Sequence, residues 1–164
     1  MSLFQMALLS AAFLCSLVAG FLLAFALVVM PGIRRMDDGD FIRTFQVIDR
    51  VIQNNQALFM LMWVGSVLAV LAVSGFGFWA LGGTDRLLTI VAALVYLLGV
   101  QLPTVIVNVP LNNQLQRLQP DAMTDSARAQ ARVNFESPWN RWNVFRAVGA
   151  SVASLLWMLL LVRV

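Results

Sequence analysis

Long runs of apolar residues alternate with short polar segments along the whole chain. Four runs are long enough to cross a lipid bilayer, which takes about 20 residues each. They predict membrane-spanning helices over residues 3–30, 56–81, 87–109 and 138–163. Because a backbone in lipid must satisfy its own hydrogen bonds, each run is expected to be helical. The pattern predicts an all-α membrane protein, a four-helix transmembrane bundle formed by a single domain over residues 1–164.

The first long connection follows Pro31, which marks the end of the first span. After Asp40, a suitable N-cap, apolar residues recur at helical spacing and polar residues fill the other faces. The apolar positions are Phe41, Phe45, Ile48 and Ile52. The pattern predicts an amphipathic helix before the second span, lying on the membrane surface or extending that span.

The second long connection leads into the fourth span. Asp125, Arg128 and Arg132 are spaced as on one helix face, which predicts a short solvated helix with local ion pairs. Ser137 and Pro138 are the residue types preferred at an N-cap and at the first helical position. The fourth spanning helix is therefore expected to begin at this pair.

Charge distribution predicts the orientation in the membrane. All eleven basic residues are arginines, and only Arg86 and Arg163 lie away from the two long connections. Positively charged connections remain in the cytoplasm, so both long connections and the amphipathic helix are expected there, with both termini outside.

Composition excludes several classes of protein. The chain is 60% hydrophobic and 12% charged, whereas a soluble domain carries about 25% charged residues. The net charge of +3 comes from dispersed arginines, which does not indicate a nucleic-acid partner. The chain has no histidine and one cysteine, Cys15, so the commonest metal ligand and general base are missing. We predict no metal site and no cofactor.

A polar and aromatic stripe opens the fourth span. Trp139, Trp142, Asn143 and Arg146 share one helix face, and no charged residue follows Arg146 until Arg163. An arginine facing lipid at a helix centre would cost about 2.5–3.5 kcal/mol, which favours an inward side chain. The alternative is an interfacial aromatic belt whose arginine reaches back to the headgroups.

A second polar set closes the third span, where Asn108 and Asn112 flank Pro110. These asparagines could bond the backbone that the proline frees. They could instead form a pocket with the stripe, because antiparallel spans place the two sets at one depth. The candidate catalytic residues are Arg146, Asn143, Asn108 and Asn112. The candidate ligand-binding residues are Trp139, Trp142, Asn143, Arg146, Asn108, Asn112, Gln46 and Asn54.

Such a pocket suits a flat apolar molecule with a few oxygens, such as a quinone or a polycyclic phenol. Arg146 could stabilise an enolate or phenolate, and the asparagines could orient a carbonyl or dioxygen. Asp49 and Glu136 are the acidic residues nearest this pocket. A salt bridge to a nearby arginine is the expected role of both, and action as a base is the alternative.

These motifs resemble the anthrone-oxygenase-like family of four-span membrane proteins, a mostly bacterial group long described as a domain of unknown function. The resemblance rests on the asparagine pair around Pro110, on the stripe from Trp139 to Arg146, and on the segment from Phe45 to Asn54. Some relatives carry a histidine near the start of the fourth span, where this chain has Asn143.

The resemblance implies oxidation of a lipophilic aromatic by dioxygen without a metal or flavin, as fungal members oxidise anthrones to anthraquinones. It also implies a bacterial cytoplasmic membrane. Two other roles fit a short chain with little mass outside the bilayer: a non-catalytic subunit of a membrane complex, and a lipid or quinone binder. The expected partners are the bilayer, a flat aromatic or quinone-like ligand, and other membrane subunits or further copies of the chain.

Overall fold

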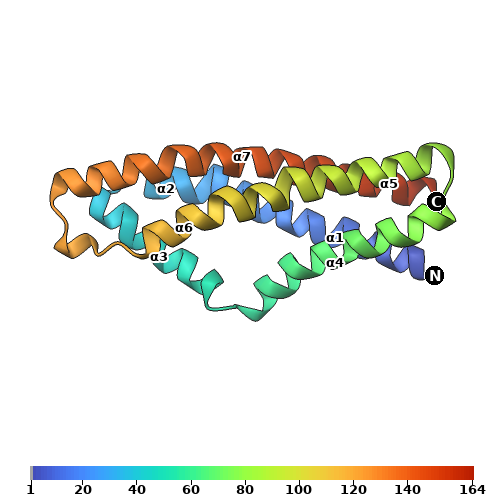
Figure 1. Cartoon of the computed structure of the whole chain (residues 1–164), viewed down its shortest axis with the longest axis horizontal. Helices are drawn as coiled ribbons and strands as arrows, with labels where there is room; N and C mark the ends of the chain where they lie inside the picture. The colour runs from blue at the N-terminus through green and yellow to red at the C-terminus, as the bar shows by residue number, and fades with distance from the viewer. Residues whose placement is uncertain (1) are drawn as a thin grey trace.

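The computed structural model describes residues 2–164, which contain helices and no β-strand (Figure 1). Four helices are long and apolar enough to cross a membrane: Leu3–Ile33, Ala57–Ala80, Gly83–Gln116 and Asp125–Arg163. The predicted all-α bundle with four spans is confirmed. The elements are α1 (Leu3–Ala24), η1 (Phe25–Val29), α2 (Met30–Ile33), α3 (Asp38–Gln53), α4 (Ala57–Ala80), α5 (Gly83–Tyr96), η2 (Leu97–Gln101), η3 (Thr104–Asn108), α6 (Val109–Gln116), η4 (Pro120–Ala122) and α7 (Asp125–Arg163).

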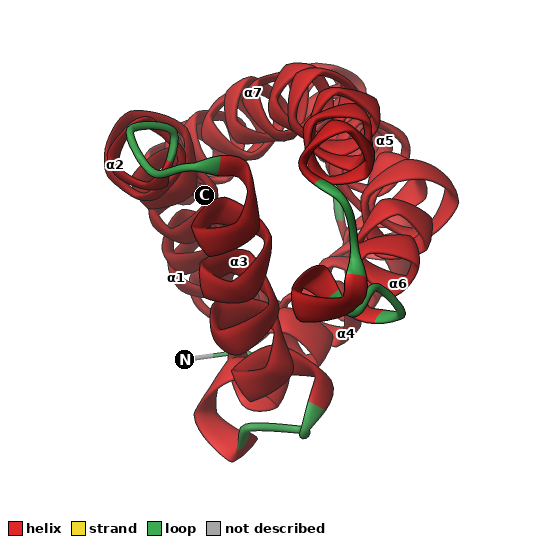
Figure 2. Cartoon of the chain, turned by 90° about the vertical axis from the view of Figure 1, so that its left-hand side faces the viewer, coloured by secondary structure: helices red, strands yellow, loops and turns green. Residues whose placement is uncertain are grey.

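The spanning helices form a ring in which α1 packs on α4 and α7, and α5 packs on the same two helices (Figure 2). The centre of the ring is filled by small and medium side chains together with Tyr96 and Trp157. Large apolar side chains such as Leu27, Leu58 and Val105 cover the outside, as expected of a surface in contact with lipid. Both termini lie at one end of the bundle, and α3 and η4 lie at the other, here termed the α3 end (Figure 1).

Pro31, Pro103 and Pro110 lie within the first and third spanning helices and do not end them. A π turn precedes each one: Met30 donates to the carbonyl of Phe25 before Pro31, and the same i→i−5 pattern precedes Pro103 and Pro110. The wider turn gives the helix room where a proline ring would otherwise meet the preceding turn. The first and third helices therefore continue past residues 30 and 109, where the spans are predicted to end, to Ile33 and Gln116.

The predicted start of the fourth helix at Ser137–Pro138 is also wrong. Helix α7 begins at Asp125, with Thr124 as its N-cap, and runs unbroken through Pro138. Phe135 and Trp139 are buried on either side of the proline, so tertiary packing holds this part of the helix together. The solvated helix predicted around Asp125 is the beginning of α7. The local ion pair expected there is present between Asp125 and Arg128, at 3.0 Å.

A separate helix, α3, precedes the second span, as the amphipathic pattern predicts. Its N-cap is Asp37, whose carboxylate accepts a hydrogen bond from the backbone of Asp40, so Asp40 lies inside the helix. Helix α3 ends at Gln53, and Asn55 adopts a left-handed backbone conformation with a φ of 57°. Helix α3 therefore does not extend α4, and the two diverge from this turn (Figure 1).

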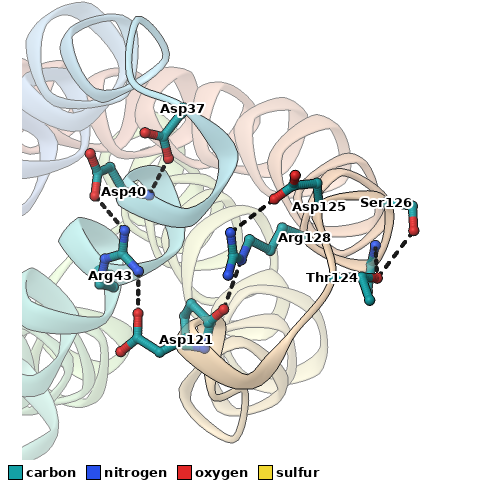
Figure 3. Close-up of polar contacts among 10 residues, drawn as sticks. Asp37, Asp40, Arg43, Asp121, Thr124, Asp125, Ser126 and Arg128 are labelled. Atoms are coloured by element: carbon teal, nitrogen blue, oxygen red, sulfur yellow. Dashed lines mark hydrogen bonds and ion pairs between the residues drawn. The ribbon is translucent and has the colours of Figure 1, made fainter.

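Exposed and partly buried polar contacts connect α3, η4 and α7 at this end of the bundle (Figure 3). The Arg43 guanidinium donates to Asp40 and to Asp121 on η4, both at 2.6 Å. Arg128 on α7 donates to the carbonyl of Pro120 at 2.7 Å. Phe41 and Phe45 then face inward and pack edge-on against Phe135 of α7. This arrangement positions the inner face of α3 beside the polar residues of α6 and α7.

Candidate functional site

A cavity opens between the helices at the α3 end of the bundle. Its volume is about 210 Å³, below the ~300–1,000 Å³ of pockets for drug-sized ligands, so it suits a compact molecule. Aromatic and apolar side chains make up most of its wall. The lining residues are Phe21, Leu22, Phe25, Phe45, Asp49, Ile52, Phe59, Trp63, Thr104, Asn108, Val109, Asn112, Trp139, Asn143 and Arg146.

Arg146 points inward and is 4% exposed. Its Nη1 donates to the Oγ1 of Thr104 at 3.0 Å, and its Nη2 donates to the Oδ1 of Asn143 at 3.1 Å. The guanidinium also lies 5.9 Å from the centre of the Trp139 ring. Within residues 2–164 no carboxylate pairs with it, so its positive charge is balanced only by dipoles and an aromatic face.

Two polar atoms of cavity residues are buried without a hydrogen-bond partner: the Nε of Arg146 and the Oδ1 of Asn108. One is a donor and the other is an acceptor. Buried polar atoms are nearly always paired, so these two atoms are the groups of the cavity with free hydrogen-bonding capacity. The Nδ2 of Asn108 is used, since it donates to the carbonyl of Trp139 at 3.3 Å.

Asp49 lies on the cavity wall and is 2% exposed. Asn112 donates to one carboxylate oxygen at 2.8 Å, and Gln53 and Gln116 donate to the other at 2.7 and 2.9 Å. Burial raises the pKa of this carboxyl above its ordinary value, and the three amide hydrogen bonds offset part of that rise. None of the arginines within residues 2–164 pairs with it, so the expected salt bridge of Asp49 is not formed there.

A chain of hydrogen bonds connects Asp49 to the stripe on α7. The indole Nε1 of Trp139 donates to the Oδ1 of Asn112 at 2.7 Å, and Asn112 donates in turn to Asp49. Both asparagines of the third span therefore bond across helices, rather than to the backbone near Pro110. Trp139 therefore contacts the carboxylate through Asn112 and has the guanidinium near its ring face.

The structure brings five of the eight candidate ligand-binding residues to the cavity: Trp139, Asn143, Arg146, Asn108 and Asn112. The other three lie elsewhere. Trp142 is half-buried and packs edge-on against Phe145 at 5.4 Å. Gln46 is buried and donates to the carbonyls of Leu115 and Leu118. Asn54 is exposed at the end of α3.

Several cavity residues are not among the sequence candidates. Thr104 lies one turn before Asn108, a spacing that could have identified it. Phe59 and Trp63 are similarly one turn apart and stack at 5.5 Å. Glu136 pairs with Arg132 at 2.8 Å, as expected of it, and does not line the cavity. No group of three or more His, Cys, Asp or Glu side chains within residues 2–164 could hold a metal ion.

Comparison with known proteins places the chain in a family. Residues 50–156 match the family model described as anthrone oxygenase. The matched segment includes α4 to α6 and most of α7, and with them every candidate catalytic residue, while Asp49 immediately precedes it. No curated protein and no solved structure gives a significant match. Because the family match covers more than half of the sequence, the chain belongs to the anthrone oxygenase family.

Proposed function

We propose that the cavity binds a flat, lipophilic phenol or quinone-like molecule and that the protein oxidises such a molecule with dioxygen. The observation that carries this proposal is the buried guanidinium of Arg146, which has no acidic partner and faces a largely aromatic cavity. A buried charge left without a counterion is costly, and a ligand oxygen that carries negative charge would compensate it.

The shape and chemistry of the wall favour a flat ring system. Trp139 packs against Phe25 and Phe45, with ring centres 5.7 and 5.3 Å away, while Phe59 stacks on Trp63. The indole of Trp63 is held by a hydrogen bond of 3.0 Å to Gln101. Aromatic faces attract other rings in offset or edge-on arrangements, and such pairs add about 0.5–1.5 kcal/mol beyond burial alone.

The polar groups suit a ligand that carries oxygens. The free Nε of Arg146 can donate to a carbonyl or an enolate oxygen, and the free Oδ1 of Asn108 can accept from a hydroxyl. A guanidinium in a site shielded from water stabilises an oxyanion far more than it would in water. Arg146 would therefore favour the deprotonated form of a bound phenol or anthrone, which is the form that reacts with dioxygen.

Membership of the family supports anthrones as the model substrate. One anthrone and one dioxygen give one anthraquinone and one water: a methylene carbon loses two hydrogens and gains an oxygen, and the second oxygen atom leaves as water. In this proposal dioxygen accepts the electrons directly, without a metal or flavin. Arg146 stabilises the negative charge on the ketone oxygen, while Asn108, Asn112 and Asn143 orient the ring or the incoming dioxygen.

The charge distribution supports a location for the reaction. Nine arginines lie in or beside the connections at the α3 end. Arg86 lies in the first turn of α5 and Arg163 ends α7 and bonds to Asp85, so both lie at the end that holds the C-terminus. By the positive-inside rule the α3 end, and with it the cavity, faces the cytoplasm, and we propose a bacterial inner membrane. A lipophilic substrate would then enter from the inner leaflet of the bilayer.

The test uses the purified chain in lipid nanodiscs with dithranol, a dihydroxyanthrone. Quenching of tryptophan fluorescence reports binding, and an oxygen electrode reports turnover against the spontaneous rate without protein. We expect saturable binding and faster dioxygen uptake, both strongly reduced in Arg146→Gln. Arg141→Gln changes an exposed arginine of the same helix and should leave both unchanged.

Other outcomes would identify the alternative roles. Binding of dithranol or a quinone without dioxygen uptake would make the protein a binder. Stable co-purification with other polypeptides, without binding or turnover, would indicate an accessory subunit. The absence of both binding and turnover over a panel of anthrones and hydroquinones would overturn the proposal.

A further inference from the structure

Two opposite charges lie buried on the wall of one cavity without pairing. The guanidinium of Arg146 bonds to Thr104 and Asn143, and the carboxylate of Asp49 bonds to neutral amides only. Asn112 bonds to Asp49 and accepts from the indole of Trp139, and the ring of that tryptophan lies 5.9 Å from the guanidinium. Buried charges normally pair directly, because pairing offsets the cost of removing each from water. Here both charged groups line one cavity, and no ion pair joins them.

A separated pair of this kind has a definite preference among ligands. The site as a whole is neutral, so an anionic ligand attracted by Arg146 would also meet the negative charge of Asp49. A neutral molecule avoids that repulsion when it presents a proton donor to the carboxylate and an oxygen acceptor to the guanidinium. The aromatic walls between the two ends then accommodate the ring system.

We propose that Asp49 is the general base of this site, and that the cavity selects neutral aromatic ligands with an acidic C–H or O–H at one end and a carbonyl oxygen at the other. This inference rests on the proposed function. It gives Asp49 a catalytic role and narrows the substrate class to ketone and phenol tautomers that ionise when they lose one proton.

The proton and electron balance is complete for an anthrone. The Asp49 carboxylate takes a proton from the ring methylene and becomes a neutral acid. The C–H electron pair moves through the ring, and the negative charge comes to lie on the ketone oxygen beside Arg146. The enolate reduces dioxygen, and a C–O bond forms at the former methylene carbon. Asp49 returns its proton to the peroxide oxygen. Asp49, ionised again, takes the remaining proton from that carbon as the C–H electron pair forms the carbonyl and the O–O bond breaks. The departing hydroxide accepts this proton from Asp49 and leaves as water.

The surroundings of Asp49 suit a base. The three amide donors stabilise its ionised form, while burial raises its pKa, so it is a stronger base than an exposed aspartate. The side chains facing it are Gln53 on its own helix and Asn112 and Gln116 on α6, all neutral. Arg50 adjoins Asp49 in the sequence and Arg117 adjoins its partner Gln116, and both arginines are exposed.

The test compares wild-type protein with Asp49→Asn in nanodiscs, with dithranol as the probe. Three quantities are measured: binding from tryptophan quenching, formation of the coloured dithranol anion from its absorbance, and dioxygen uptake. We expect Asp49→Asn to bind within about threefold of wild type, to form no bound anion, and to lose at least about 100-fold in rate, the lower range for a missing general base. Asp49→Glu should recover part of the rate, and Asp125→Asn serves as an exposed control.

Two further measurements keep the inference testable if Asp49→Asn folds poorly. The wild-type rate should rise with pH as one group ionises, with a pKa above that of an ordinary aspartate. Wild type should also prefer neutral dithranol to anthracenecarboxylate, an anion of similar shape. A flat pH profile, equal affinity for the anion, or a well-folded Asp49→Asn that turns over at the wild-type rate would overturn the inference and leave the proposed function intact. If wild type neither binds nor oxidises dithranol, the proposed function itself fails.

Discussion

The Nη2 of Arg146 donates a hydrogen bond of 3.1 Å to the Oδ1 of Asn143, one turn earlier on α7. The Nδ2 of the same asparagine donates to the backbone carbonyl of Leu22 on α1, also at 3.1 Å. One amide therefore holds the guanidinium and joins α7 to α1. Because no carboxylate pairs with the arginine, this contact and the one to Thr104 determine where its charge points.

Replacing Asn143 by leucine removes both bonds while keeping the volume similar. The carbonyl of Leu22 and the guanidinium each lose a partner, so we expect stability to fall by about 1–3 kcal/mol. Binding of dithranol should weaken by about tenfold, which corresponds to 1.4 kcal/mol. Thermal unfolding and fluorescence titration measure the two effects. Asn140→Leu, on the same helix but outside the cavity, should change neither, and equal effects of the two variants would contradict the assignment.

The raised pKa of Asp49 should make the free energy of unfolding depend on pH. Its pKa in the folded protein lies above the ordinary 3.8, so the folded state binds this proton more tightly than the unfolded chain. As pH rises from 3.8 through the raised pKa, the unfolded chain loses the proton first, and the free energy of unfolding falls. Above the raised pKa the decrease in the free energy of unfolding is constant.

Thermal unfolding of wild type and Asp49→Asn from about pH 3 to pH 7 measures this effect. As pH rises from 3.8 through the raised pKa of Asp49, the unfolding temperature of wild type should fall relative to that of Asp49→Asn. Asp125→Asn, which alters an exposed carboxylate, should give no such trend. A shift in the opposite direction would mean that the carboxylate is stabilised in the fold.

The ion-pair network at the α3 end predicts unequal effects of two arginines. Arg132 donates to Glu136, Asp38 and the carbonyls of Arg34 and Met36, and its guanidinium lies 4.5 Å from the centre of the Phe41 ring. Its side chain is only 14% exposed. Arg132→Gln should therefore lower stability by about 1.5–3 kcal/mol, the range for hydrogen bonds to a charged group.

Arg43 provides the matched comparison, because it also bridges two carboxylates but is 41% exposed. Exposed ion pairs contribute little, since solvent screens them and their side chains lose entropy. Arg43→Gln should leave the unfolding temperature nearly unchanged. Equal destabilisation by the two variants would show that the network acts as one unit.

The four spans could be predicted from the sequence because lipid imposes a simple rule: a long apolar run must form a helix. Helix boundaries depend on finer chemistry. Pro31 and Pro110 indicate helix ends by local rules, but π turns let the helices continue past them. Pro138 indicates a helix start, but packing of Phe135 and Trp139 carries α7 through it.

Helical spacing also predicted part of the cavity wall. Trp139, Asn143 and Arg146 lie on the cavity, whereas Trp142 lies at the edge of their shared face and turns toward Phe145. The role of Asp49 could not be predicted in this way. Its partners Asn112 and Gln116 are 63 and 67 residues away in sequence, and only the packing of α3 against α6 brings them together.

Substitutions of Trp139 and Trp142 test whether only the first of these two tryptophans belongs to the cavity wall. Trp139→Phe keeps an aromatic ring beside Arg146 but removes the indole N–H that donates to Asn112. The partly buried Oδ1 of Asn112 loses its donor. We therefore expect a loss of stability of about 0.5–1.5 kcal/mol and a change in the pH dependence of dioxygen uptake, because Asn112 also bonds to Asp49. Trp142→Phe removes an indole N–H that has no partner on the cavity and should change neither quantity. Thermal unfolding and pH–rate profiles of the pair decide the matter: if Trp142→Phe has the larger effect, the stripe acts as a membrane-interface belt and not as one wall of the site.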